Sequence, residues 1–345
     1  MFQKNISLRP YHTFGIQVAT KSFATFRSQK EFKTVFAQAK KPIFILGGGS
    51  NILFTKNFDG TVLKNNIRTK RIGKQKGNKT LIHIGAGVNW HQLVRWAISK
   101  NLGGIENLSL IPGTVGAAPI QNIGAYGVEL KDVFAQAKCI VLEKITFNNQ
   151  TYNQGDFLII HQDEAQFGYR NSIFKTTLKG KVAIVQVALW LTHQNHQINT
   201  QYGAITSELT NRKIKNPSIK DISDAIIAIR ESKLPDPKKI GNSGSFFKNP
   251  YIDTEKYEKL KKKFPKMPAY PVDNETVKLA AGWLIQESGW KGFRDGDAGC
   301  YDKQALVLVN YGDATGKEIQ ALAQKIQQSV KKKFGIMIQP EVNIL

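Results

Sequence analysis

A run of three glycines is the first feature of this sequence that could bind a ligand. The apolar stretch Ile43–Leu46 leads directly into residues 47–51, which read Gly-Gly-Gly-Ser-Asn. Because glycine turns the backbone with positive φ and leaves amide N–H groups uncovered, such a loop suits a diphosphate. Isoleucine at position 52 argues against the dinucleotide fingerprint of a Rossmann fold, and no Walker-type loop occurs. On the loop alone, a glycine-rich hairpin turn without a ligand stays open.

A second glycine-rich stretch covers residues 111–127. It holds four glycines and two prolines among small residues, and Gln121 and Asn122 add amide groups that form hydrogen bonds. Small side chains let a flat group approach the backbone closely, whereas a long uncharged loop on a bare surface would expose apolar atoms. We therefore favour contact with a cofactor over a plain connecting loop.

Histidine, cysteine and serine give no sign of metal or hydrolase chemistry. The two cysteines, Cys139 and Cys300, are too few for a disulfide scaffold or a cysteine-rich zinc site. Ser245 has no Asp/His pair at a recognisable spacing, so a catalytic triad is not expected. We predict no catalytic metal, while a cation near a diphosphate stays open. Metal-ligand spacing is missing among the histidines at 12, 83, 91, 161, 193 and 196.

Regular elements must hold these loops in place, and the apolar spacing predicts several of them. Strands are predicted at Ile43–Leu46, at 81–84 and over the apolar run 182–191. Amphipathic helices are predicted at Trp90–Ser99 and Ile219–Lys233, the second ended by the prolines that follow it. Beyond that point we predict helices at 254–264 and 276–287, a strand at 305–310, a helix opened by a capping box of Thr315 and Glu318, and a short strand at 336–338.

Length and composition limit the class of protein. With 345 residues, of which 41% are hydrophobic and 22% charged, the chain suits a globular protein of roughly two domains. The N-terminus lacks the apolar stretch of a signal peptide, and the longest apolar run is about half a membrane span. We expect a cytosolic protein, in a reducing compartment and without membrane insertion.

Basic residues outnumber acidic ones by 49 to 26, which gives a formal net charge of +23. The lysines are scattered, and the densest clusters, at 261–263 and 331–333, fall in predicted helices. We interpret the excess as a generally basic solvated surface. A funnel for an anionic ligand is the second interpretation and a nucleic-acid site the third.

Taken together, these segments resemble a known enzyme family, UDP-N-acetylmuramate dehydrogenase, also called UDP-N-acetylenolpyruvoylglucosamine reductase. The matching motifs follow one another in order over nearly the whole chain, and several are long. They read HTFGI at 12–16, LGGGSN at 46–51, the loop 112–127, FGYRNSIFK at 167–175, KLPDPK at 233–238, GSFFKNP at 244–250 and QPEV at 339–342.

The resemblance implies a fold, a reaction and a cofactor. The fold class is α+β, with a vanillyl-alcohol-oxidase-type FAD-binding region at 1–215 and a smaller α+β substrate-binding domain at 216–345, whose C-terminal strand returns Glu341 to the active site. The reaction is the NADPH-dependent, FAD-mediated reduction of the enolpyruvyl ether on UDP-N-acetylglucosamine to UDP-N-acetylmuramate, a peptidoglycan precursor. FAD would contact both loops, at Gly47, Gly48, Gly49, Ser50, Asn51, Pro112, Gly113, Thr114, Gly116, Ala117, Asn122, Gly124 and Tyr126.

Reduction of a vinyl ether beside a carboxylate requires charge stabilisation and a proton, because reduced flavin supplies only the hydride. The resemblance assigns stabilisation of the enolate to Arg170 and Glu341. The planar fork of Arg170 suits a carboxylate, which it can bind bidentately. The resemblance assigns the late proton to Ser245, whose hydroxyl can protonate a strongly basic carbon.

The resemblance also implies contacts to the sugar nucleotide. Lys233 and Asn249 match positions at the UDP diphosphate, and lysine suits phosphate as a point charge. Tyr202 resembles the tyrosine of a mobile loop that closes over the nucleotide in one subclass of the family. Tyr169 and Gln304 are further matches.

Two positions depart from the pattern of the family. Tyr301 stands where many relatives have histidine, and Asn343 stands two residues beyond Glu341 where some relatives have arginine. One substrate contact is therefore either missing or supplied elsewhere. Neither change touches the three residues assigned to catalysis.

Two other functions stay open. Another flavoenzyme of the same FAD fold, such as an oxidase of small alcohols or sugars, would share the glycine loops but has no reason to carry the motifs at 233–238 and 244–250. A non-catalytic nucleotide- or nucleic-acid-binding protein would use the positive charge, but aromatic residues are not interleaved with the basic ones at a regular pitch. We expect a monomer that binds the sugar nucleotide and NADPH, and no nucleic acid.

Overall fold

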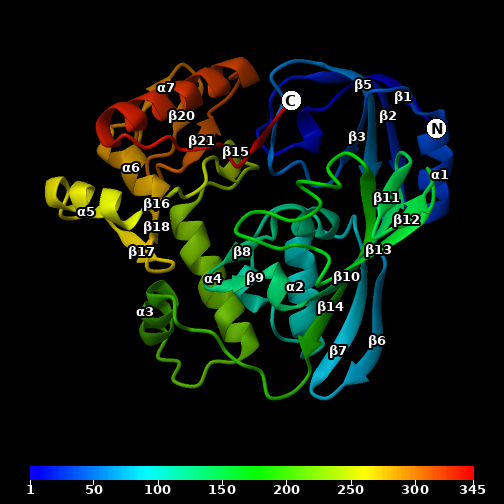
Figure 1. The fold of residues 1–345 in the computed structure, drawn as a ribbon, viewed down its shortest axis with the longest axis horizontal. Helices are drawn as coiled ribbons and strands as arrows, with labels where there is room; N and C mark the ends of the chain where they lie inside the picture. The colour runs from blue at the N-terminus through cyan, green and yellow to red at the C-terminus, as the bar shows by residue number, and fades with distance from the viewer. The chain divides into compact units, whose positions relative to one another are not determined.

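The computed structural model describes all 345 residues and divides them into two compact units. The first unit comprises residues 1–6, 20–48 and 59–232, and the second comprises 7–19, 49–58 and 233–345. The chain therefore passes between the units several times, once inside the triple-glycine loop. Figure 1 labels the helices and strands of both units.

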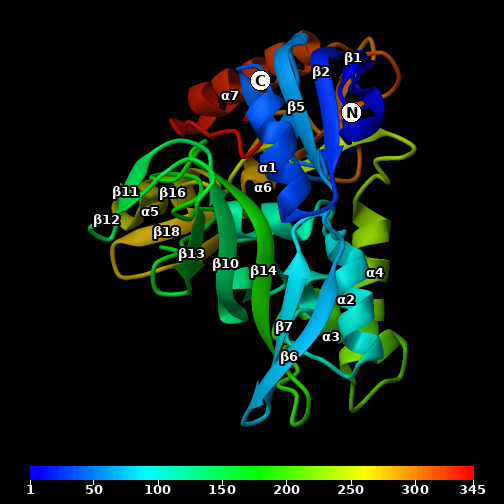
Figure 2. The same ribbon diagram turned by 90° about the vertical axis from the view of Figure 1, so that its right-hand side faces the viewer.

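An antiparallel sheet of five strands forms the centre of the first unit (Figure 2). Its middle strand is the long apolar run of the sequence, most of whose side chains are buried. Helix α2 (Trp90–Ser99) buries Leu93, Val94 and Ala97 in the same hydrophobic cluster as the inward side chains of this sheet. The strands follow the order β13 (Phe157–His161), β10 (Phe134–Val141), β14 (Val182–Thr192), β7 (Lys79–Gly85) and β6 (Lys70–Lys76).

A second sheet of the first unit has four strands. Helix α1 (Gln29–Gln38) covers part of it, with the Phe32 ring centroid 4.8 Å from that of Phe26 and 5.3 Å from that of Phe36. Helices α3 (Gly203–Asn211) and α4 (Ile219–Lys233) pack on each other through a separate small cluster of isoleucines and leucine. The strand order is β1 (Gln3–Ser7), β2 (Ala19–Phe26), β5 (Phe58–Asn65) and β3 (Ile43–Leu46).

Short elements carry the second glycine-rich stretch. Residues Val115–Gln121 form the 3-10 helix η3, and Asn122 ends it in the left-handed region with φ 44°. The hairpin of β8 (Gly124–Ala125) and β9 (Val128–Glu129) follows. The remaining short elements of this unit are η2 (Glu106–Leu108), η4 (Leu130–Asp132), β11 (Ile145–Phe147) and β12 (Gln150–Tyr152).

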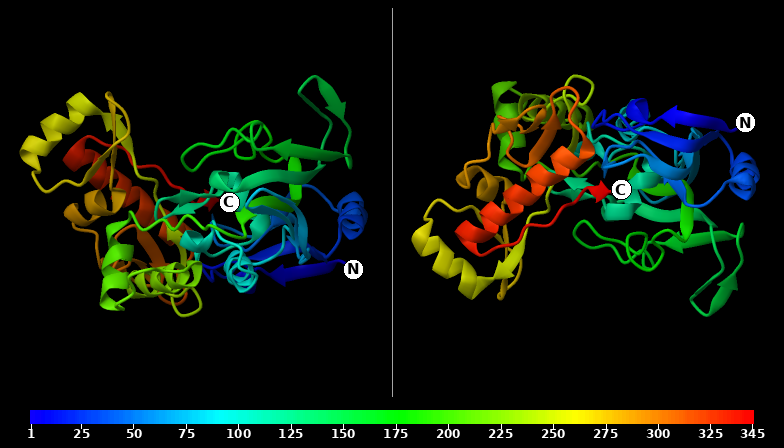
Figure 3. Two further views of the ribbon diagram at one scale, coloured as in Figure 1. Left: turned by 90° about the horizontal axis from the view of Figure 1, so that it is seen from below. Right: turned by 90° about the horizontal axis from the view of Figure 1, so that it is seen from above.

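The second unit contains two larger sheets, one pair of short strands and three α-helices (Figure 3). Rings of Phe264, Trp283 and Phe334 pack together and join α5 (Thr254–Lys263), α6 (Ala281–Glu287) and α7 (Gly316–Phe334). One sheet has the order β15 (Gly241–Ser245), β21 (Val307–Asn310), β20 (Ala298–Cys300), β19 (Arg294–Asp295), and the other β16 (Tyr251–Asp253), β18 (Thr276–Leu279), β17 (Ala269–Pro271). Two segments far apart in sequence, β4 (Ile52–Leu53) and the C-terminal β22 (Asn343–Ile344), pair in parallel, and η1 (Arg9–Tyr11) completes the unit.

Most predicted elements are confirmed. Helices α2 and α4 have the predicted bounds, and the capping box of Thr315 and Glu318 opens α7. The helix predicted at 276–287 is wrong in its first turn, because Val277 and Leu279 alternate with outward residues and form β18 before α6 begins. The strand predicted at 336–338 is also wrong: this segment is buried at alternate residues but has no ladder partner.

The predicted boundary between an FAD-binding region at 1–215 and a substrate-binding domain at 216–345 concerns function and stays a prediction. The compact units divide the chain later, between residues 232 and 233, so that nearly all of α4 belongs to the first unit. Two short N-terminal segments, 7–19 and 49–58, belong to the second. None of the helices is long and apolar enough to cross a membrane.

Candidate active site

The two glycine-rich loops, which the sequence identifies separately, meet in the first unit. A Cβ on Gly48 would lie 2.6 Å from the Cα of Gly113, and a Cβ on Gly47 would lie 2.7 Å from Oγ1 of Thr114. These separations are too short for any side chain, so glycine is required where the backbones approach. The Thr114 hydroxyl is buried without a hydrogen-bond partner. An unused donor between two glycine loops suits the expected phosphate groups of FAD.

A half-buried lysine binds the first loop. Lys64 on β5 donates a hydrogen bond to the carbonyl of Gly47. Burial, and then the neighbouring charge of Arg68, lower the pKa of the Lys64 ammonium to about 8. The sequence analysis missed this residue, because a single lysine inside an apolar strand carries no motif.

The last glycine of the run belongs to the second unit. Gly49 has φ +64°, and a Cβ there would overlap the Tyr11 carbonyl. The amide of Thr13 donates to the Gly49 carbonyl over 3.0 Å.

His12, next to Thr13 in the motif at 12–16, is buried. Burial lowers the pKa of its imidazole, although a hydrogen bond to the Ile16 carbonyl raises it. Its Nδ1 has no partner.

Asn51 ties the end of the first loop to the C-terminal segment within the second unit. Its Nδ2 donates to the Glu341 carbonyl over 3.3 Å. In return, Nδ2 of Asn343 donates to the Asn51 carbonyl over 3.0 Å. Asn343, one of the two departures from the family pattern, therefore has a structural contact of its own.

The second loop is anchored by backbone bonds along η3. The Trp90 amide donates to the Gly113 carbonyl over 3.0 Å, and the Gly116 amide donates to Ala86 over 2.9 Å. A Cβ on Gly116 would lie 2.5 Å from that of Ala86. Ser50, Pro112 and Ala117 lie within these two loops.

Arg170 lies in a tight turn of the first unit. Gly168 and Asn171 exchange two backbone hydrogen bonds, of 3.1 and 3.2 Å, and Arg170 between them has φ 51°. Its Nη2 donates to the Gly124 carbonyl over 2.7 Å. The guanidinium carbon is 5.4 Å from the centroid of the Tyr169 ring. Positive φ in a bulky residue is a strained state that its surroundings must hold.

Ser245 and Glu341 are neighbours in the second unit, although 96 positions separate them (341 − 245). The Glu341 amide donates to the carbonyl of Phe246 over 2.8 Å, and the next residue, Phe247, forms a bridge with Pro340. The Ser245 side chain is exposed and follows Gly244, whose φ is +71°, at a bulge of β15. The backbone of the residue after Ser245 therefore pairs with the backbone of Glu341.

Two of the expected substrate residues meet at the start of α6. Oδ1 of Asn249 accepts from the Ala281 amide over 3.0 Å and so caps the helix. Oε1 of Gln304 lies 2.9 Å from where a Cβ on Gly282 would stand. Lys233 is exposed at the end of α4. Tyr301 is half-buried.

The other expected tyrosines lie in the first unit with an arginine that the sequence analysis missed. The rings of Tyr126 and Tyr202 meet edge to face, with centroids 5.1 Å apart, and Tyr202 is 50% exposed. Arg230 on α4 forms a hydrogen bond with the Tyr126 side chain, while its buried Nε has no partner. Helical periodicity placed Arg230 near the end of α4 but could not show which residues it meets.

A second missed feature is a row of three aligned side chains on the three-stranded sheet, two of them exposed tyrosines. Tyr251, Lys278 and Tyr270 lie opposite one another on β16, β18 and β17. The Lys278 ammonium is 5.8 Å from the Tyr270 ring centroid. Because the sequence pattern indicated a helix over 276–287, this alignment could not be predicted.

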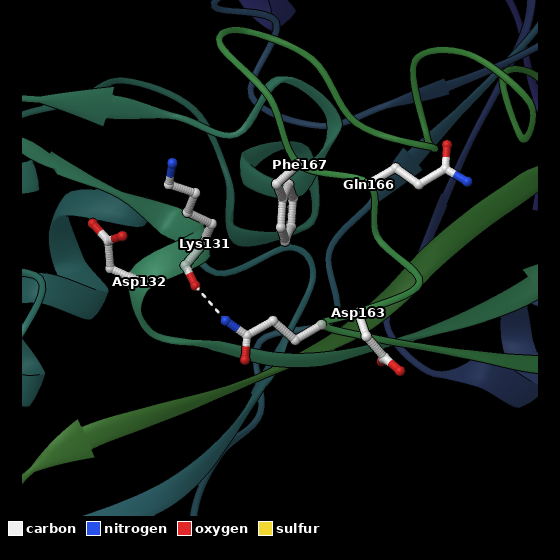
Figure 4. Close-up of a pocket in the computed structure, with 6 residues that line it drawn as sticks. Lys131, Asp132, Asp163, Gln166 and Phe167 are labelled. Atoms are coloured by element: carbon white, nitrogen blue, oxygen red, sulfur yellow. Dashed lines mark hydrogen bonds between the residues drawn. The ribbon is translucent and has the colours of Figure 1, made fainter.

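The surface also carries one shallow hollow of ≈ 490 Å³, shown in Figure 4. Nε2 of Gln162 donates to the Lys131 carbonyl over 2.9 Å on its edge, and the Phe167 ring forms one wall. None of the predicted site residues lines it. No group of three or more histidine, cysteine, aspartate or glutamate residues is arranged to hold a metal ion.

Comparison with known proteins assigns both parts of the chain. The FAD binding domain family matches residues 21–143, and the C-terminal domain of UDP-N-acetylenolpyruvoylglucosamine reductase matches residues 236–345. The enzyme of that name from Flavobacterium johnsoniae is 48% identical over 99% of both chains. That from Pseudomonas aeruginosa is 43% identical over 99% of this chain and 98% of its own.

A solved structure supports the fold. The UDP-N-acetylenolpyruvylglucosamine reductase of Thermus caldophilus has a TM-score of 0.67 at 22% identity, covering 100% of this chain and 99% of that one. The predicted order, an FAD-binding domain followed by a second mixed α/β domain, is confirmed. The chain therefore belongs to the UDP-N-acetylenolpyruvoylglucosamine reductase family and is an FAD-dependent oxidoreductase of peptidoglycan precursor synthesis.

Proposed function

We propose that this chain reduces the enolpyruvyl ether of UDP-N-acetylglucosamine to UDP-N-acetylmuramate, with NADPH as the reductant. The observation that carries the proposal is the C-terminal segment that sets Glu341 beside Ser245. A hydroxyl at the end of β15 and a carboxylate on the segment that pairs with the next residues suit a site where an enolate forms and is then protonated.

The two glycine loops are the proposed FAD site. FAD held there would supply the hydride chemistry that links NADPH to the enolpyruvyl group. The contact of Gly48 with Gly113 and the unused Thr114 hydroxyl support this assignment. Residues 47–51 and 112–126 would hold the cofactor, chiefly through the backbone.

Arg170 and Glu341 are proposed to stabilise the enolate. Negative charge grows on the substrate carboxylate as hydride arrives, and the Arg170 fork can bind both of its oxygens. Because the turn fixes the Arg170 backbone and Gly124 accepts from Nη2, little reorganisation is needed when the charge develops. Glu341 would polarise the same group.

Ser245 is proposed to deliver the proton. Ser245 is exposed and follows the positive-φ residue Gly244 at a bulge of β15, so solvent and a ligand can reach its hydroxyl. A serine hydroxyl is a weak acid, yet an enolate carbon is basic enough to take its proton.

We assign the sugar nucleotide to the remaining predicted residues. Lys233 and Asn249 would contact the diphosphate, with Tyr169 and Gln304 nearby, and Tyr202 would place the chain in the subclass with a mobile tyrosine loop. The ring of Tyr202 is 50% exposed, which supports a side chain that can move. We further propose a monomer acting in the cytoplasm, where free thiols such as Cys139 and Cys300 persist.

An anaerobic visible spectrum tests the proposal. Purified protein with FAD should bleach when NADPH is added and regain its yellow colour when the enolpyruvyl sugar nucleotide follows. Bleaching without recovery would favour another flavoenzyme and overturn the proposed substrate. UDP-N-acetylglucosamine, which lacks the vinyl ether, is the matched control and should leave the flavin reduced.

A further inference from the structure

Three alternate residues of the second glycine loop bind the turn that carries Arg170. The Ser172 hydroxyl donates to the carbonyl of Ile120 over 2.7 Å, and Arg170 donates to the carbonyl of Gly124. Between these two bonds, Nδ2 of Asn122 donates to the carbonyl of Gly168 over 3.2 Å. The loop and the turn are thus bonded at three successive points.

Asn122 is the middle one of these three points, and both polar atoms of its side chain form hydrogen bonds within the protein. It is 0% exposed. Its Nδ2 also donates to Oε2 of Glu129 over 2.9 Å, and its Oδ1 accepts from the Lys131 amide over 3.0 Å. An amide group has two donor hydrogens, and both are used here. The side chain therefore has no donor left for a cofactor.

The bonded partner explains what Asn122 does. The Gly168 carbonyl closes the four-residue turn by accepting from Asn171, and Arg170 lies inside that turn with positive φ. A strained residue keeps its conformation only when its surroundings hold it. Asn122 binds the carbonyl of Gly168, the first residue of the turn. The Arg170 guanidinium is bound to the Gly124 carbonyl.

We propose that Asn122 is a positioning residue. It acts through the Gly168 carbonyl to set the position and direction of the Arg170 side chain, instead of binding FAD with its own side chain. This inference rests on the proposed role of Arg170 in the reaction. It links the loop assigned to the cofactor with the residue assigned to the substrate carboxylate. A shift of Arg170 by about 1 Å is enough to cost a large factor in rate.

Asn122→Asp is the test variant. Aspartate has the same shape, tolerates the left-handed region and keeps an oxygen for the Lys131 amide, but it cannot donate to Gly168. Asn149→Asp is the matched control, because Asn149 also has positive φ, at 60°, and lies exposed in the turn between β11 and β12. Both proteins should bind FAD as the unmodified chain does.

Stopped-flow measurement of the two half-reactions gives the expected result. Asn122→Asp should leave the rate of flavin reduction by NADPH within about twofold, and should slow reoxidation by the enolpyruvyl sugar nucleotide by about 10- to 100-fold. In the Arg170→Ala background the same change should alter reoxidation by less than about twofold, since residues that act as a unit are not additive. Asn149→Asp should change neither rate.

Several outcomes would overturn the proposal. Loss of FAD from Asn122→Asp would show that the Asn122 side chain binds the cofactor. An additive effect on reoxidation in the Arg170→Ala background would show that Asn122 does not act through Arg170. Full rescue by adding Glu129→Gln would trace the loss to repulsion between two carboxylates instead of to the Gly168 bond. If the unmodified enzyme is not reoxidised by the sugar nucleotide at all, the proposed function fails first, and the two failures are thereby distinguished.

Discussion

The two units hold their proposed catalytic residues in different ways. Ser245 and Glu341 are placed by backbone hydrogen bonds and a strand bridge, which depend little on the side chains of the residues that form them. Arg170 is placed by side chains, namely those of Asn122 and Ser172 and its own guanidinium, and its backbone is strained. The first arrangement should tolerate substitution of its side chains without moving, whereas the second should not.

Ser245→Ala gives the largest expected effect and tests the tolerant side of this comparison. The backbone ladder should keep Glu341 in place, so only the proton is lost, and reoxidation should slow by about 10²- to 10⁴-fold while NADPH still reduces the flavin. Rapid-mixing spectroscopy of both half-reactions checks this. Ser243→Ala is the matched control on the same strand, because its buried hydroxyl has no partner and its removal should change little. Equal losses in both variants would contradict the assigned role.

Arg170→Lys should come next and tests the sensitive side. Lysine keeps the charge but loses the planar fork, and the ammonium cannot bind Gly124 and both carboxylate oxygens in the same geometry. We expect a loss of about 10²- to 10³-fold in kcat/KM for the sugar nucleotide, measured by steady-state NADPH oxidation. Arg212→Lys, in an exposed ion pair with Glu208 on α3, is the control. A variant as active as the unmodified enzyme would show that charge alone suffices.

Gly48→Ala examines a contact in which two backbones meet without any side chain. The added methyl would meet the Gly113 backbone, which cannot move aside as a flexible side chain would. We expect a loss of about 1–3 kcal/mol in the free energy of unfolding and weaker FAD retention, measured by urea titration and flavin fluorescence. Gly203→Ala, with open space around it, is the control and should be neutral or slightly stabilising. If Gly48→Ala changed neither stability nor FAD retention, an added Cβ would lie further from the Gly113 Cα than 2.6 Å.

These residues also show how far the sequence could lead. The apolar spacing fixed α2 and α4, since a helix is set by neighbours three and four residues apart. Both glycine loops were identified as well, from composition alone. Their meeting at Gly48 and Gly113 could not be predicted, because the contact spans 65 positions (113 − 48) and no periodicity reports such a distance.

The same limit applies to side chains that act at long range. The resemblance to the family assigned Asn122 to FAD, and only the structure reveals its bond to Gly168, 46 positions away. Arg230 and Lys64 carry no motif, and their surroundings come from other elements. The error at β18 has a different cause: four residues of alternating pattern precede a true helix, and the two periods merge in a short window.

Lys64 gives the smallest expected effect. Like Arg170, it is a cation that donates to a loop carbonyl, but its charge titrates in an accessible pH range. Each of the two cations donates to a glycine carbonyl of one loop, but the Lys64 pKa is lowered to about 8 by burial. In the unfolded chain its pKa returns to the usual value near 10.4. Between these two values the unfolded state binds more protons than the folded state, so the free energy of unfolding should rise with pH over this window.

Lys64→Met removes the titration and serves as the reference. The difference in stability between the unmodified protein and Lys64→Met should shift in favour of the unmodified protein by about 1–3 kcal/mol between pH 7.5 and about 10.5. Urea titrations at a series of pH values measure this difference, in which the exposed lysines cancel. A difference that stays flat would mean that Lys64 is hydrated. The glycine loop would then be held by backbone contacts alone, as Ser245 and Glu341 are. Of these two cations, only Arg170 would bind a loop carbonyl.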